Sequence, residues 1–142
     1  MKGRPTGTPA GIERLCLLVA GSVSAGVHAG LAAEHLHEWP PLGAAFIAAA
    51  VLLSAAVAMY AIRPTDDRPP RALLLLLAGT IAAYASTRLL ALPPLDPTRE
   101  PLDALGLVTT AVETAGLILA LRLGRRLSIR RLPLAIPSGG TR

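Results

Sequence analysis

The sequence predicts an all-α fold, a four-helix transmembrane bundle with both termini on the cytoplasmic side. Three observations lead to this prediction. Hydrophobic residues make up 52% of the 142 residues and charged residues only 16%, whereas soluble domains are roughly 25% charged. The apolar residues form four long runs, with prolines and charges gathered between them. Arginine and lysine concentrate on the connections that would share one side of a membrane.

Each apolar run is long enough to be a membrane-spanning helix, because about 20 residues cross a hydrocarbon core of about 30 Å. Backbone amides in lipid must be hydrogen-bonded within the segment, which favours helix. The expected spans cover residues 15–33, 42–62, 72–92 and 102–121. We expect one transmembrane domain over residues 1–142, and mobile tails at 1–11 and 133–142.

The first run carries the small residues Gly26 and Gly30, whose spacing would let another helix approach closely. The second run is almost wholly apolar, with only Ser54 and Tyr60 mildly polar, and it lacks the polar stripe of a soluble amphipathic helix. The third run contains the ionisable residue Arg88, and the fourth contains Glu113 near its middle. The prolines between residues 40 and 101 all lie outside the four runs, which supports these boundaries.

The distribution of basic residues predicts the orientation. Of the 14 Lys and Arg residues, all but Arg88 and Arg99 fall on one side of the predicted bundle. By the positive-inside rule, segments 63–71 and 122–142 are cytoplasmic, and segments 34–41 and 93–101 are extracytoplasmic. The alternative is a cleaved signal peptide over residues 1–33, which would leave three spans. Orientation explains the net charge of +5, and the aromatics are too few for base stacking, so we expect no nucleic-acid partner.

Ionisable residues inside spans usually face other helices or a cavity. Glu113 lies near the middle of the fourth run, where its carboxyl group must be protonated, paired with a cation or in contact with water. We expect it to pair with Arg88 or His28, although Arg88 could instead extend to the headgroups. The predicted outward-facing polar pocket contains His28, Arg88, Glu113, Ser24, Tyr84 and Thr109. Two interpretations stay open: the cluster fixes helix register, or it binds a proton, a metal or a small ligand.

A second candidate site follows the first run, where all three histidines lie within residues 28–39. Imidazole and carboxylate groups suit a divalent transition metal ion. The candidate ligands are Glu34, His35, His37 and Glu38. On one helix His35 and His37 point to opposite sides, while Glu34 lies one turn from His37 and Glu38. The alternatives are an interfacial turn anchored by Trp39, a pH-responsive gate, and haem ligation through His28.

No catalytic motif is present. The chain lacks a glycine-rich phosphate loop, a Ser-His-Asp arrangement in a nucleophile elbow, and a CxxC pair, and Cys16 is its single cysteine. An enzyme is therefore the third choice of function.

The runs HAGLAAEHLHEWPPLGAAF and STRLLALPPLDPTREPLDALGLVTTAVETAGLILAL resemble a family of small, uncharacterised bacterial four-span membrane proteins, common in actinobacteria. The shared pattern is a His…Glu-His turn, a Ser-x-Arg before Leu-Pro, and an acidic-Pro segment leading to a buried Glu. The matching positions are His28, Glu34, His35, Ser86, Arg88, Leu92, Pro93, Glu100, Pro101 and Glu113. Leu89 stands where that pattern has Thr. The resemblance brings no known activity, and the excess of arginine over lysine also indicates a bacterial source.

These patterns together predict an integral membrane protein that binds a cation or metal, or assists its transport. The alternative is a non-catalytic structural or assembly subunit of a larger membrane complex. The expected partners are the lipid bilayer and either another membrane protein or a second copy of the chain.

Overall fold

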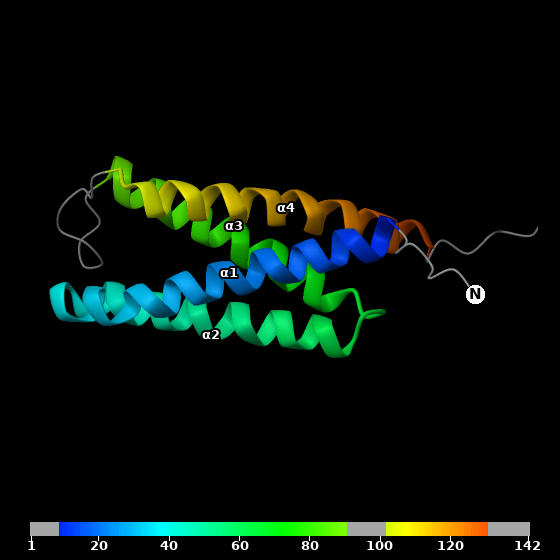
Figure 1. Ribbon diagram of the computed structural model, residues 1–142, viewed down its shortest axis with the longest axis horizontal. Helices are drawn as coiled ribbons and strands as arrows, with labels where there is room; N and C mark the ends of the chain where they lie inside the picture. The colour runs from blue at the N-terminus through cyan, green and yellow to red at the C-terminus, as the bar shows by residue number, and fades with distance from the viewer. Residues whose placement is uncertain (1–8, 91–101, 131–142) are drawn as a thin grey trace, which may run out of the picture.

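The computed structural model describes residues 9–90 and 102–130 (Figure 1). Its elements are α1 (Pro9–Glu38), α2 (Pro40–Ile62), α3 (Arg68–Leu89) and α4 (Ala104–Arg130). The described chain is all-helical, and all four helices are long and apolar enough to cross a membrane. The chain therefore has the architecture of a multi-pass membrane protein.

The helices extend beyond the apolar runs that predict them. α1 has 30 residues, about 45 Å of helix against about 30 Å of hydrocarbon. It begins at Pro9, so residues 9–11 of the expected N-terminal tail are helical, while residues 1–8 and 133–142 lie outside the described residues. Hydropathy locates the segment inside lipid, whereas intrahelical hydrogen bonds continue the helix into its polar flanks.

Prolines and one aromatic residue define the turn between α1 and α2. Trp39 alone separates the two helices, in an extended conformation with φ −147° and ψ 96°. Pro40 and Pro41 begin α2, where the missing N–H of proline costs no intrahelical bond. The Trp39 carbonyl accepts hydrogen bonds from the backbone N–H groups of Leu42 and Gly43. The connection between α1 and α2 is thus a single residue.

The four helices form two hairpins, α1 with α2 and α3 with α4, which meet where α1 packs on α4 and α2 on α3. One end of the bundle, here the arginine end, contains the start of α1, the α2–α3 connection and the end of α4 (Figure 1). The other, the histidine end, contains the end of α1 and the starts of α2 and α4. The hairpins lie closer together at the arginine end and diverge towards the histidine end in this view.

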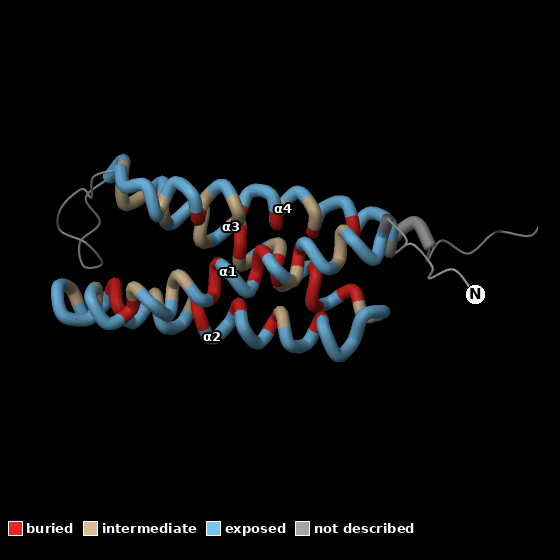
Figure 2. The backbone as a smooth tube through the Cα atoms, viewed as in Figure 1, coloured by how far each residue is buried: buried red, intermediate tan, exposed pale blue. Residues whose placement is uncertain are grey.

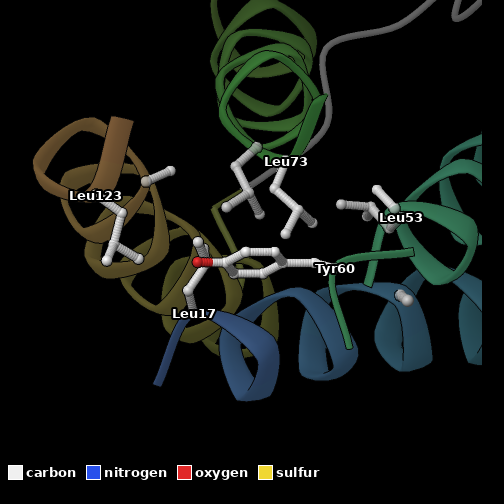
Figure 3. Packing of buried hydrophobic residues seen from close by; sticks show 9 residues of the cluster. Leu17, Leu53, Tyr60, Leu73 and Leu123 are labelled. Carbon is white, nitrogen blue, oxygen red and sulfur yellow. The ribbon is translucent and has the colours of Figure 1, made fainter. Parts of the chain in front are cut away.

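Burial follows the same division (Figure 2). Leucines and Tyr60 from all four helices interlock in the arginine half (Figure 3). The buried members of this leucine core are Leu17, Ala25, Leu53, Ala56, Tyr60, Leu73, Leu77, Ala120 and Leu123. Along α3, by contrast, no residue from 78 to 89 is buried. The core therefore joins the hairpins in one half of the bundle.

Candidate functional site

Glu113 projects from α4 into the bundle, where the residue is 2% exposed. The hydroxyl of Ser24, itself fully buried on α1, donates a hydrogen bond to Glu113 Oε1 at 2.6 Å. Small residues make this approach possible. A Cβ at Gly116 would lie 2.9 Å from Leu77 Cδ1 and 3.0 Å from Ala20 Cβ. The Ser24–Glu113 contact therefore links the two hairpins where α1 and α4 meet.

The depth of Glu113 limits its chemistry. It lies ten residues after Asp103, about 15 Å along the helix, which places it near the middle of a span. An ionised carboxylate without a cation is costly in a site of low dielectric constant, and one hydroxyl hydrogen bond does not offset that cost. A negative charge on Glu113 therefore requires a cation beside it.

His28 lies one turn beyond Ser24 on α1. Its Nδ1 donates a hydrogen bond to the Ser24 carbonyl at 2.9 Å. Because a carbonyl oxygen only accepts, this contact assigns a hydrogen to Nδ1. Ser24 therefore contacts Glu113 through its side chain and His28 through its backbone.

Phe46 of α2 lies between two histidine rings of α1. Its centroid is 5.2 Å from that of His28 and 4.4 Å from that of His35. Both ring pairs are tilted, a favourable aromatic geometry. Sequence reasoning missed Phe46, and the apolar run around it contained no signal that it would meet the histidines.

Arg88 belongs to a different cluster, at the histidine end of α3 and α4. Its guanidinium group pairs with Asp103 Oδ2 at 2.8 Å and lies 4.4 Å from the centroid of the Tyr84 ring. The expected pairing of Glu113 with Arg88 or His28 is therefore corrected. Arg88 pairs with Asp103, His28 contacts the Ser24 carbonyl, and Glu113 is hydrogen-bonded to the Ser24 hydroxyl. Asp103 is partly exposed, so the charged pair there avoids the desolvation cost that a pair at mid-span would incur.

Asp103 also caps α4. Its Oδ1 accepts a hydrogen bond from the Gly106 backbone N–H at 2.6 Å. That bond, followed by the hydrogen bond and charge of Arg88, holds the pKa of the Asp103 carboxyl below its usual value, against an opposing effect of burial. A Cβ at Gly106 would lie 2.4 Å from Tyr84 Cε2, so this glycine lets the ring lie against α4. A carboxylate just before a helix is a common N-cap, and this was the signal available in the sequence.

The remaining pocket candidates divide between these clusters. Thr109 is buried one turn before Glu113, and its hydroxyl donates to the Leu105 carbonyl at 2.8 Å. The Tyr84 hydroxyl is buried without a hydrogen-bond partner among the described residues. The structure therefore brings together Ser24, His28 and Glu113, with Thr109 adjacent, and places Tyr84 and Arg88 with Asp103.

The candidate metal ligands lie in the last two turns of α1. His35 Nδ1 is 3.7 Å from Glu38 Oε2, while Glu34 and His37 are exposed. Within the described residues, no group of three or more His, Cys, Asp or Glu side chains is arranged to hold a metal ion. These four residues point in different directions around one helix, and the described part of the other helices adds no further ligand to them.

The contacts of the glycines differ from expectation. A Cβ at Gly26 or Gly30 would have no atom within 4 Å, so neither is a point of close approach between the described helices. A Cβ at Gly43 would lie 2.4 Å from the backbone of Leu36. Gly26 instead lines a shallow groove of about 350 Å³ between α1 and α2. The other residues lining this groove are Ser22, Ala25, Ala29, Ser54, Val57 and Ala58.

Comparisons of the chain with protein-family models, with curated proteins and with solved structures found no match. The contacts of Ser24, His28 and Glu113 are therefore the basis on which a function can be argued.

Proposed function

We propose that this chain is a small cation-binding membrane protein in which the Glu113 carboxyl group is the binding group and a proton is the resident cation. One observation carries the proposal. A carboxyl group that is 2% exposed lies at mid-span with a serine hydroxyl 2.6 Å away. A carboxyl group kept from water in this way changes its charge only by exchanging a proton or by binding another cation.

The oxygen and nitrogen atoms near Glu113 limit which cation can replace the proton. Ser24 supplies one hydroxyl, and His28 supplies an imidazole one turn away. A divalent transition metal usually takes three or more protein ligands, a set not found among the described residues. A monovalent cation exchanging with a proton fits this donor set better.

Infrared spectroscopy of the purified protein tests this exchange, because a neutral carboxyl group and a carboxylate absorb at different frequencies. We expect a neutral-carboxyl band at neutral pH that is lost in Glu113→Gln and retained in the control Glu34→Gln, which alters an exposed carboxylate. Adding Na⁺ or K⁺ should diminish the band and release about one proton per bound cation. A carboxylate at position 113 that responds neither to pH nor to these cations would refute the proposal.

We further propose that the arginine end faces the cytoplasm of a bacterial cell, following the positive-inside rule. The single cysteine makes the test simple. In a Cys16→Ala background, Glu38→Cys should react with a membrane-impermeant maleimide applied to intact cells. Arg125→Cys should react only after the membrane is opened. The reverse pattern would invert the topology.

A second candidate is a subunit of a larger membrane complex, favoured by the groove between α1 and α2. Its lining of small residues suits the close approach of a transmembrane helix from a partner protein. Ala29→Leu would fill this groove without touching Glu113. Release of a stoichiometric partner by Ala29→Leu, with the infrared band unchanged, would favour this second function over the first.

A further inference from the structure

Arginines define the boundary of the exposed apolar surface on three helices. On α4, Ile118, Leu121, Arg122 and Arg125 are all exposed. Their spacing of three, four and seven residues places them on one face of the helix. This exposed face therefore changes from aliphatic to guanidinium side chains within one turn.

The same change occurs on α2 and α3. Met59 and Ile62 are exposed near the end of α2, and Arg63 follows them on that face. On α3, exposed Arg68 and Arg71 precede exposed Leu75 at the matching spacing. All three transitions lie at the arginine end of the bundle (Figure 1). Aliphatic side chains facing lipid end where hydrocarbon ends, so these guanidinium groups lie at the depth of the headgroups.

The acidic residues at this end are already engaged. Glu13 pairs with Arg126 at 2.8 Å, and Asp67 pairs with Arg71 at 2.8 Å. Asp66 accepts a hydrogen bond from the backbone N–H of Arg68. Arg14 donates to the carbonyls of Tyr60 and Ala61 at the end of α2.

Four exposed guanidinium groups remain without an ion pair in the described part of the chain. They belong to Arg63, Arg68, Arg122 and Arg125. We name these four the arginine ring.

We propose that the arginine ring binds the phosphate groups of anionic phospholipids in the adjoining leaflet. Guanidinium groups hold phosphate oxygens through paired hydrogen bonds, and basic residues next to a span attract anionic headgroups. The histidine end offers the opposite charge, because Glu34 and Glu38 are exposed there and Arg88 is paired with Asp103. The recognition is therefore confined to one leaflet, and it is independent of cation binding at Glu113.

The test is a lipid-retention measurement on the full chain in detergent, incubated with equal amounts of phosphatidylglycerol and phosphatidylcholine. Native mass spectrometry then counts the lipids retained. We expect the wild type to prefer phosphatidylglycerol. The variant Arg122→Gln/Arg125→Gln should lose about tenfold or more of that preference, since each basic group near an anionic surface contributes roughly fivefold. The charge-conserving Arg122→Lys/Arg125→Lys should keep most of it.

Two further variants sharpen the result. Arg63→Gln/Arg68→Gln should produce a comparable loss of the preference for phosphatidylglycerol. If only the Arg122/Arg125 variant lost the preference, the claim that the four arginines form one binding surface would be wrong. Glu34→Gln/Glu38→Gln should leave the preference unchanged. An unchanged melting temperature in phosphatidylcholine micelles confirms that the glutamine variants fold. Equal retention of both lipids by the wild type would overturn the proposal. So would competition by inorganic phosphate at the same concentration, which would indicate a free phosphate site.

Discussion

The two halves of the bundle are stabilised differently. In the arginine half, side chains from all four helices interlock in one leucine core. In the histidine half, the helices associate in pairs. Gly43 and Phe46 hold α2 to α1, while Asp103 and Gly106 hold α4 to α3. The Ser24–Glu113 hydrogen bond lies between these two halves.

This difference shows that packing between the hairpins joins them in the arginine half. In the histidine half, contacts within each hairpin hold its two helices together. A four-helix core resists the separation of the hairpins, because parting them would break packing on every helix. A pairwise contact resists only the opening of its own hairpin. Each of the following substitutions removes one kind of contact. Thermal unfolding in detergent micelles measures the change in stability for each variant.

Gly43→Ala should have the largest effect, a loss of about 3 kcal/mol. The new Cβ would lie 2.4 Å from both the Cα and the N of Leu36, and backbone atoms cannot rotate away. The matched control is Gly26→Ala, where the added Cβ meets nothing within 4 Å and alanine is the better helix former. Equal stability of the two variants would show that α1 and α2 are not in this close contact.

Leu17→Ala should cost about 2 kcal/mol. Leu17 is fully buried in the leucine core. The loss arises from packing, since leucine in the separated helices would already face lipid. The control Leu15→Ala removes a side chain that is 61% exposed and should be close to neutral. If both variants unfolded alike, the core would not be what joins the hairpins.

Ser24→Ala should cost about 1 kcal/mol, because it removes the hydroxyl from a buried carboxyl group. The double variant Ser24→Ala/Glu113→Leu replaces both partners with apolar groups and should recover most of that stability. Failure of the double variant to recover would show that Glu113 stabilises the bundle through contacts other than Ser24.

Asp103→Ala should have the smallest effect, between about 0.5 and 1 kcal/mol, through loss of the N-cap of α4. In the folded chain the pKa of Asp103 lies below its ordinary value of 3.8, mainly because the Gly106 N–H donates a hydrogen bond to the carboxylate. Its stabilising contribution is therefore complete above pH 3.8 and disappears as the pH falls through the lower, folded value. Unfolding curves of wild type and Asp103→Ala should converge below that value. A constant gap between the curves at acid pH would assign the effect to something other than this carboxylate.

Much of the fold could be predicted from the sequence, because lipid imposes strict rules. Length, hydropathy and proline position identified four helices that could span a membrane. The ends were placed less well: the run that begins near residue 15 belongs to a helix that begins at Pro9. Hydropathy reports where lipid begins, and α1 continues past that point.

The candidate site was predicted in part. A carboxylate at position 113 had to face other helices, and it is buried as that rule requires. The expected partner was Arg88 or His28, whereas the observed partner is Ser24, because the choice of partner depends on how the hairpins meet. Arg88 lies near the end of α3, where Asp103 is within reach. Arg88, one of the two partners expected for Glu113, therefore pairs with the nearby capping residue Asp103.

The single-residue link at Trp39 has a consequence for biogenesis. With no polar loop between α1 and α2, insertion of the first hairpin carries almost no free backbone across the hydrophobic barrier. The two helices can enter the bilayer as a preformed pair. In the proposed orientation, the charged segment that follows them then remains on the side of synthesis. A polar spacer introduced at Trp39 would lengthen the stretch of unpaired backbone that must cross this barrier.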